Sequence, residues 1–399
     1  MSSGGINSLE TLVDLVTNPP ADLLRPEARE IAVMALTDLT GVTLAGVTEE
    51  VAAIVAALVG GSASSGASIV GSGAIVSEAD AALVNATIGH ALDFDDSSFV
   101  LGGHPSVVIY PALLAVAEAR GKSPANVISA YLVGLEALSR ISRAVNFAHY
   151  EKGWHPTATL GIFGAAAGAA HLLRLDPART AHALGIAAAM SSGIKASFGS
   201  MTKPFQVGHA CSSGLTAALL AKAGMTASRD ALDAKDGFFI LFNGEGNFDA
   251  AAVSRPSGET GLPDLKFKLY PSCGSTHVVI DAARKLRADM ALEPDEIASV
   301  EISINPRRLA HVNRPAVSDP LEGKFSLQFT AAAALCDGNV TVDHFNRETL
   351  AHADIAALLP KITVRPRNSS RESAKSAIES KSTRPTVVVT TRFSGSASI

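Results

Sequence analysis

The chain has 399 residues, which is enough for two or three domains and a large apolar core. Hydrophobic residues make up 47% of it and aromatic residues only 5%, so the core is expected to consist mainly of Ala, Val and Leu. The net charge is −5 and there is no basic block, which argues against a nucleic-acid partner, since such proteins usually carry a basic stripe.

Other features of the composition predict the compartment. The three cysteines are far apart and lack zinc-ligand spacing, so we expect neither a structural metal nor a disulfide framework. Residues Met1 to Ser8 are polar and lack the pattern of a signal peptide, and a cytoplasmic protein is therefore expected. The most apolar window, Thr157–Leu173, is rich in Ala and Gly and contains His171, which predicts a buried helix and no membrane span.

Helical patterns dominate the first part of the chain. Proline marks three helix starts, at Pro26, Pro124 and Pro177, because the first helical position needs no N–H donor. The expected helices cover residues 26–48, 49–59, 77–92, 107–120, 124–145, 157–173, 177–191 and 206–224. The Gly/Ser-rich stretch Gly60–Gly73 has no Lys at phosphate-loop spacing, so we expect a loop with one or two short strands there.

The pattern changes after about residue 262. β-Branched or alternating segments predict strands, with two helices between them. The expected strands are residues 300–304, 361–364 and 385–391, and the helices are 276–288 and 327–336. We therefore predict a mainly α large domain at 1–262 and a smaller α+β lid domain at 263–399. Residues 366–384 are rich in Ser, Arg and Lys and are expected to form a mobile loop.

Polar side chains gather in five segments of otherwise apolar sequence. These segments are residues 90–104, 153–156, 201–204, 266–277 and 311–315. Three of them place His104, His155 or Lys203 before a proline, a position that favours extended geometry just outside a helix. Removing a proton beside a carboxylate needs a base near the carbon, and cations or donors that stabilise enolate-like charge. The His, Asp and Lys residues of these segments supply both.

Each of these residues also has a structural interpretation. Asp95 and Asp96 could cap a helix end or face solvent, and His104 and His155 could be hydrogen-bonded structural residues. Cys273 could be a small buried apolar residue.

Two other enzyme classes can be weighed against the same residues. The acidic run Asp93-Phe-Asp95-Asp96 would suit a magnesium-dependent diphosphate enzyme, but a second metal-binding motif is missing from the sequence. A pyridoxal-phosphate enzyme using Lys203 would need a phosphate-binding loop, which we do not find in the sequence.

Five motifs occur in a fixed order along the chain. They are His-Ala-Leu-Asp-Phe-Asp-Asp-Ser from residue 90, Gly-His-Pro-Ser from 103, Gly-Trp-His-Pro-Thr-Ala-Thr-Leu-Gly from 153, Met-Thr-Lys-Pro from 201 and Lys-x-Tyr-Pro-Ser-Cys-x-x-x-His from 268. Together they resemble the MmgE/PrpD family. The resemblance spans about residues 10–390. It implies a helical domain with an α+β lid, a homodimer, an active site between the domains and no organic cofactor. It also implies a lyase or isomerase of a small di- or tricarboxylate, such as 2-methylcitrate dehydratase, cis-aconitate decarboxylase or iminodisuccinate epimerase.

The resemblance also implies site residues. By motif position the proton carriers are Asp93, His104, His155 and Cys273, and the substrate-binding residues are Ser97, Lys203, Lys268 and His311. No metal ligand is implied.

Two of these residues depart from the decarboxylase pattern. Cys273 stands where the decarboxylase has His, and His311 where it has Tyr, which argues against plain cis-aconitate decarboxylation. The Pro-Ser-Cys motif and the stretch before His104 are most similar to the epimerase branch. Relatives also usually continue beyond the lid and return to the helical domain. That return is expected to be missing here, so a non-catalytic remnant is a further alternative.

Overall fold

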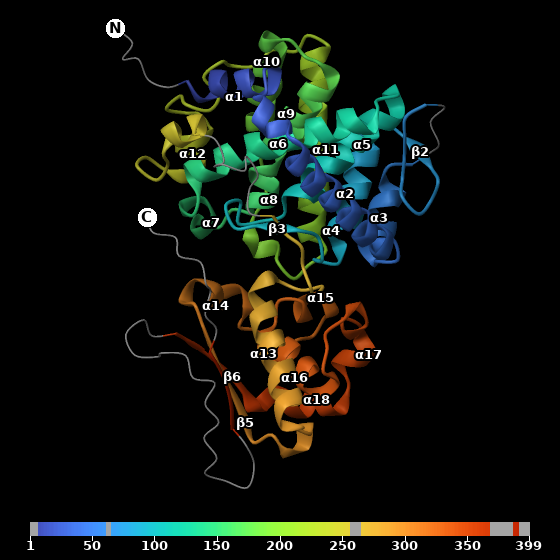
Figure 1. Cartoon of the computed structure of the whole chain (residues 1–399), viewed down its shortest axis with the longest axis vertical. Helices are drawn as coiled ribbons and strands as arrows, with labels where there is room; N and C mark the ends of the chain where they lie inside the picture. The colour runs from blue at the N-terminus through green and yellow to red at the C-terminus, as the bar shows by residue number, and fades with distance from the viewer. Residues whose placement is uncertain (1–6, 61–64, 256–264, 368–385, 391–399) are drawn as a thin grey trace. The chain divides into compact units, whose positions relative to one another are not determined.

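A computed structural model describes residues 7–60, 65–255, 265–367 and 386–390, the last as backbone only (Figure 1). The chain divides into two compact units. The larger unit comprises residues 1–197 and 201–268, and the smaller comprises residues 198–200 and 269–399. This arrangement confirms the predicted mainly α domain with a smaller α+β domain. The predicted boundary between residues 262 and 263 lies outside the described residues and stays a prediction.

The larger unit is built almost entirely from helices. They are α1 (Ser8–Thr17), α2 (Pro26–Gly46), α3 (Glu50–Leu58), α4 (Glu78–Ala91), α5 (Pro105–Arg120), α6 (Pro124–Val145), α7 (Ala148–Lys152), α8 (Pro156–Thr159), α9 (Gly161–Leu173), α10 (Pro177–Met190), α11 (Thr202–Lys222) and α12 (Phe238–Asn243). Two short antiparallel strand pairs complete it, β1 (Ala67–Ser68) with β2 (Ile75–Val76) and β3 (Ser97–Ser98) with β4 (Leu265–Lys266). The eight predicted helices are present, and α1, α7 and α12 were not predicted.

Small side chains let the helices of the larger unit pack closely around α9. Twelve residues of α9 are buried, most of them Ala or Gly, and its neighbours include α5, α6 and α11. By length and composition alone, Pro156–Leu173 could cross a membrane, and so could the bent pair α2 and α3 taken together. Because 94% of Pro156–Leu173 is buried inside the unit, its apolar character is explained by core packing.

Helices α4 and α11 approach each other at Gly208. A Cβ atom at this position would overlap the Thr87 hydroxyl and the Leu83 carbonyl of α4. Gly208→Ala is therefore expected to lower the free energy of unfolding by about 1–3 kcal/mol, measured by urea titration. The matched control is Gly41→Ala in α2, where no atom lies within 4 Å of the added Cβ. This change is expected to stabilise by roughly 0.5–1 kcal/mol, and equal effects at both sites would contradict the tight packing.

The smaller unit contains a parallel three-stranded sheet in the order β6-β5-β7. Its elements are α13 (Gly274–Met290), β5 (Ser299–Ile304), α14 (Pro306–Val312), α15 (Pro320–Gly323), α16 (Leu327–Asp337), α17 (Arg347–Leu350), α18 (Ala353–Leu358), β6 (Ile362–Pro366) and β7 (Thr386–Thr390). Val300, Ile302 and Ile304 are buried along β5, and Figure 1 shows α13, α16 and α18 gathered beside the sheet. The three predicted strands are confirmed. The predicted mobile loop falls almost wholly on residues 368–385, outside the described part of the chain.

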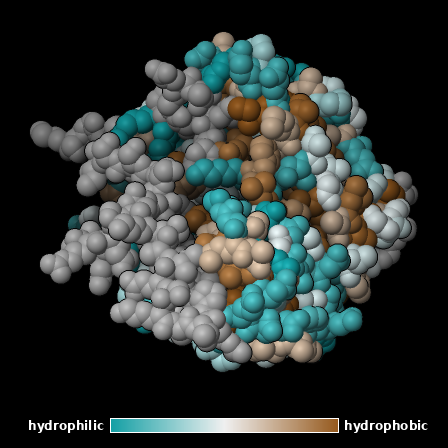
Figure 2. Space-filling view, turned by 60° about the horizontal axis from the view of Figure 1, so that its bottom comes forward, coloured by the Kyte–Doolittle hydropathy of each residue, from teal (hydrophilic) through white to brown (hydrophobic). Residues whose placement is uncertain are grey.

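Apolar residues also reach the surface. Figure 2 shows hydrophobic residues as separate patches among hydrophilic ones on the face it presents. In the larger unit, Val33, Met34 and Leu44 of α2 and Ile54 and Leu58 of α3 are each at least half exposed.

Candidate active site

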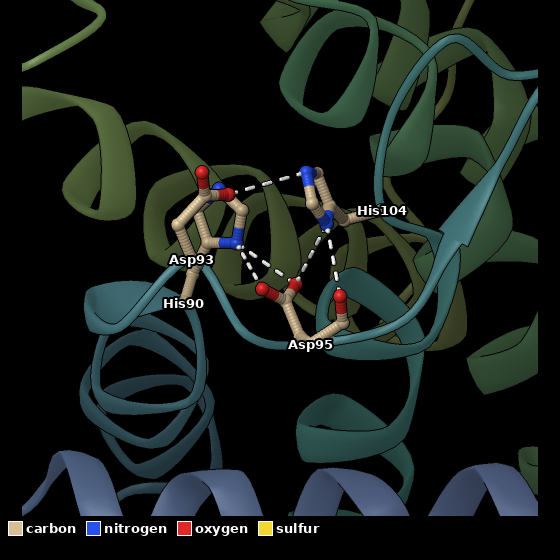
Figure 3. A group of neighbouring side chains, drawn as sticks. All are labelled: His90, Asp93, Asp95 and His104. Atoms are coloured by element: carbon tan, nitrogen blue, oxygen red, sulfur yellow. Dashed lines mark hydrogen bonds and ion pairs between the residues drawn. The ribbon is translucent and has the colours of Figure 1, made fainter. Parts of the chain in front are cut away.

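The site begins where α4 ends and the chain turns. The Asp93 amide donates to the His90 carbonyl at 3.1 Å, and Asp93 has a φ of 52°, a left-handed conformation that costs a non-glycine residue about 1–2 kcal/mol. The turn directs His90, Asp93 and Asp95 toward one another (Figure 3). All three are at most 3% exposed, so their polar groups must be satisfied inside the protein.

His104 joins this group through a second turn. The Ser98 amide donates to the Gly103 carbonyl at 2.9 Å, and Gly102 has a φ of 67°, so the chain reverses as the Gly-Gly pair predicts. His104 then precedes α5 in an extended conformation, as predicted for a residue before proline. Its Nε2 atom lies 3.5 Å from Asp93 Oδ1.

Lys203 reaches the same aspartate from α11. It lies within the first helical turn, so the predicted extended geometry is wrong for this residue. Pro204 is tolerated there because the first-turn N–H groups have no helical partner. Lys203 Nζ is 2.9 Å from Asp93 Oδ1 and 2.7 Å from His90 Nε2.

Lys268 follows β4, which pairs with β3 just after the acidic run. Its Nζ atom donates to the main-chain oxygen of Asp93 at 2.6 Å and to Asp93 Oδ1 at 2.9 Å. Two buried ammonium groups therefore share one carboxylate oxygen. The other oxygen, Asp93 Oδ2, is buried and has no hydrogen-bond partner among the described residues, which leaves an acceptor for a ligand.

Charge pairing keeps the two central carboxylates ionised. Burial acts to raise the pKa of Asp93, but Lys203 and Lys268 outweigh it and hold that pKa well below its usual value. Burial also acts to raise the pKa of Asp95. Charge interactions and hydrogen bonds with His104 and His90 outweigh burial and lower that pKa overall.

The hydrogen bonds of His104 determine its tautomer. Nδ1 lies 2.8 Å from the Asp96 main-chain oxygen, which can only accept, so Nδ1 carries a proton. Nε2 is therefore the nitrogen that can take up or release a proton, and it faces Asp93.

His155 precedes α8 in the predicted extended conformation and is 1% exposed. Its Nδ1 lies 2.9 Å from Gln206 Oε1, and the Gln206 amide nitrogen donates to Ser197 Oγ at 3.0 Å, which orients the amide. Nδ1 therefore donates and Nε2 carries the lone pair. Burial, followed by the charge of Lys203, lowers the pKa of His155 well below its usual value, so the ring is neutral. It stacks on His90 at a centroid distance of 6.2 Å.

The alternatives for Asp95 and Asp96 have different outcomes. Neither residue faces solvent. Asp96 accepts hydrogen bonds from the amide and hydroxyl of Ser106 in the first turn of α5, so it does cap a helix. Burial raises the pKa of Asp96 to about 7. Asp95 instead pairs with His90 at 2.8 Å.

The remaining predicted residues are described by other contacts. Ser97 is half-buried, and its hydroxyl donates to the Lys266 carbonyl at 3.4 Å. This hydrogen bond links β3 to β4. Cys273 and His311 belong to the smaller unit. Cys273 precedes α13, with its amide donating to the Lys324 carbonyl at 2.9 Å, and His311 lies in α14.

His90 and Asp95 were not among the predicted site residues. The sequence did carry a signal, since both stand in the polar segment that contains Asp93. Their importance depends on the turn at Asp93, which local patterns do not reveal.

The same four side chains could be considered as metal ligands. His90, Asp93, Asp95 and His104 offer ligand atoms within 4.8 Å of one another. However, both lysines donate to Asp93, and Nδ1 of His90 and Nδ1 of His104 each lie 2.8 Å from an oxygen of Asp95 or Asp96. A cation here would stand beside two buried positive charges, which is costly at low dielectric. The arrangement favours an ion-pair network, and the absence of a metal centre stays a prediction.

His149 is hydrogen-bonded to a residue that lies against the His155 main chain. Its Nδ1 lies 2.8 Å from Asn243 Oδ1, which can only accept, so in the neutral ring Nε2 accepts from the Thr159 hydroxyl at 2.7 Å. Thr159 Oγ1 also lies 3.1 Å from the His155 carbonyl oxygen. Burial lowers the pKa of His149 to about 4. The unfolded chain therefore takes up a proton as pH falls below about 6.5 while the folded chain does not, so the stabilisation present above this pH is lost as pH falls toward 4.

This titration gives a testable difference between wild type and His149→Gln. Between pH 7 and pH 5, wild type is expected to lose about 2 kcal/mol of unfolding free energy relative to the variant. Urea titrations of both proteins at both pH values measure it. A difference that does not change with pH would show that His149 is not held neutral.

Comparison with known proteins shows the family to which the chain belongs. The chain matches the MmgE/PrpD N-terminal domain over residues 10–251 and the MmgE/PrpD C-terminal domain over residues 270–397. It therefore belongs to the MmgE/PrpD family, as the motif order predicts.

Named relatives include three cis-aconitate decarboxylases. The Homo sapiens protein is 32% identical over 291 residues, covering 71% of this chain and 60% of that protein. The Mus musculus protein is 30% identical over 293 residues, covering 71% and 59%. The Aspergillus terreus protein is 27% identical over 324 residues, covering 74% and 65%. The chain thus spans about 60% of the length of the first two of these relatives.

Proposed function

We propose that this chain is a lyase that transfers a proton at a carbon next to a carboxylate of a small di- or tricarboxylate, without an organic cofactor. One observation carries the proposal: in a buried cluster, the proton-exchanging nitrogen of His104 faces Asp93, which is held by Lys203 and Lys268. The names of the relatives, all cis-aconitate decarboxylases, support a lyase and make aconitate the first substrate to test.

The proposed roles follow from the geometry. His104 takes or returns the proton through Nε2, because a ring nitrogen with a lone pair can accept a proton and then give it back. The Asp93 carboxylate stabilises the imidazolium formed, and its oxygen Oδ2 is available to accept a hydrogen bond from the substrate. Lys203 and Lys268 bind substrate carboxylate and stabilise enolate-like charge, which is worth most in a dry site. His155, held neutral, is the second candidate proton carrier.

The test is incubation of the purified protein in deuterium oxide with cis-aconitate, citrate-like acids and aspartate-like acids, followed by NMR and mass spectrometry. The proposal expects loss of carbon dioxide with solvent deuterium at a carbon next to a carboxylate of the product, or loss of water with deuterium exchanged into the recovered substrate. Deuterium with no other change in mass would instead indicate the epimerase of an iminodisuccinate-like dicarboxylate. No deuterium and no loss of water or carbon dioxide in any acid would favour a non-catalytic remnant.

A homodimer is part of the proposal. Val33 and Leu44 lie about three turns apart on one face of α2, and each is at least half exposed. We propose this face as the contact with a second copy. Light scattering is expected to show a dimer for wild type and a monomer for the double variant Val33→Glu, Leu44→Glu. A wild-type monomer would reject the dimer.

A further inference from the structure

His90 connects a carboxylate to a lysine through its two ring nitrogens. It lies in the last turn of α4 and is 1% exposed. Nδ1 is 2.8 Å and 3.0 Å from the two carboxylate oxygens of Asp95, and Nε2 is 2.7 Å from Lys203 Nζ. The three side chains come from the turn after α4, from α4 itself and from α11, so the connection joins separate parts of the larger unit.

The chemistry of the donors fixes where the proton lies on this ring. A lysine ammonium has three N–H donors and no lone pair, so His90 Nε2 must accept. Nδ1 therefore carries the proton and donates it to Asp95. Burial lowers the pKa of His90 to about 4 even though Asp95 acts in the opposite direction, which agrees with a neutral ring.

The two lysines of the site differ in what holds them. Lys268 is held by the main-chain oxygen of Asp93 in addition to Asp93 Oδ1. Lys203 shares Asp93 Oδ1 and also donates to His90, whose lone pair depends on a particular tautomer. Loss of that tautomer would place a proton opposite an ammonium group.

We propose that Asp95 and His90 form a positioning pair for Lys203. Asp95 holds the proton on His90 Nδ1, and the lone pair of Nε2 then accepts from the Lys203 ammonium and fixes it against Asp93. Neither residue of the pair touches the substrate in this scheme. The inference rests on the proposed function only in assigning Lys203 to the substrate, and it adds the residues that keep Lys203 in place. A carboxylate that sets the tautomer of a histidine acts in the same way in other enzymes.

Three variants separate positioning from simple packing. Asp95→Asn keeps the shape, but its amide can donate to Nδ1 and so move the ring proton to Nε2, facing Lys203. His90→Phe fills the space without an acceptor. His90→Gln places an amide oxygen close to the original Nε2 position and is expected to restore much of what His90→Phe loses.

The first test reads the hydrogen bonds directly and needs no activity. NMR of protein labelled with ¹⁵N in His and Lys side chains is expected to show His90 neutral, with its proton on Nδ1, from pH 5.5 to 8.5. Hydrogen exchange at Lys203 Nζ is expected to be at least about tenfold faster in Asp95→Asn and His90→Phe than in wild type, with little change at Lys268. A proton on Nε2 in wild type, or unchanged exchange at Lys203, would overturn the proposal.

The second test is a double-variant cycle on deuterium transfer to substrate. Asp95→Asn is expected to raise KM at least about tenfold in wild type and in the Lys268→Ala background, but less than about twofold in Lys203→Ala. Equal losses in both lysine backgrounds would show that Asp95 does not act through Lys203. If wild type neither transfers deuterium to any acid nor removes water or carbon dioxide from it, the proposed function fails, while the NMR result still decides whether the pair positions Lys203.

Discussion

His104→Gln is expected to lower turnover by about 10²- to 10⁴-fold, the usual contribution of a general acid or base. The reason is that Nε2 of His104 is the nitrogen that can exchange a proton beside Asp93, whereas its Nδ1 proton is held by the Asp96 carbonyl. Steady-state kinetics on the substrate identified by deuterium transfer measures the loss. His155→Gln is expected to lower turnover by a factor in the same range if His155 is the second proton carrier.

The matched control for His104→Gln is His209→Gln, which changes an exposed histidine of α11. It is expected to keep wild-type turnover, and circular dichroism is expected to be unchanged in all three variants. If His104→Gln and His155→Gln both turn over at the wild-type rate, the histidines are structural. The proton carrier would then be Asp93 or Cys273.

Replacing either buried lysine is expected to weaken substrate binding. Lys203→Ala and Lys268→Ala each remove a charged hydrogen-bond donor, worth about 1.5–3 kcal/mol, and should raise KM about ten- to 150-fold. Both ammonium groups are 5% exposed or less and 2.9 Å from Asp93 Oδ1, so water replaces them poorly.

The control is Lys266→Ala, two residues before Lys268 and exposed to solvent. It is expected to leave KM unchanged. Unchanged Michaelis constants in both Lys203→Ala and Lys268→Ala would remove the lysines from the substrate site.

The sequence predicted the helices of the larger unit because their starts are marked locally. Prolines at the first helical position gave the starts of α2, α6 and α10. The predicted start of α11, residue 206, is too late because Lys203 before Pro204 was expected to be extended, whereas the first turn of a helix tolerates proline.

Five members of the candidate site were predictable from the sequence, but their connections were not. Motif order pointed to Asp93, His104, His155, Lys203 and Lys268, which the larger unit contains together. The role of His90 depends on the left-handed turn at Asp93. Aspartate is enriched in that conformation, but only a few per cent of non-glycine residues adopt it, so the residue type alone did not predict the turn. Lys268 reaches Asp93 because β4 pairs with β3 across 169 residues, which no local pattern reveals.

The most direct test of the account is solvent deuterium transfer to cis-aconitate and citrate-like acids by wild type and His104→Gln, compared in deuterium oxide under identical conditions. The account predicts deuterium at a carbon next to a carboxylate with wild type, and a rate lower by about 10²- to 10⁴-fold with the variant. Equal rates with the two proteins, or neither deuterium transfer nor loss of water or carbon dioxide with wild type, would contradict it.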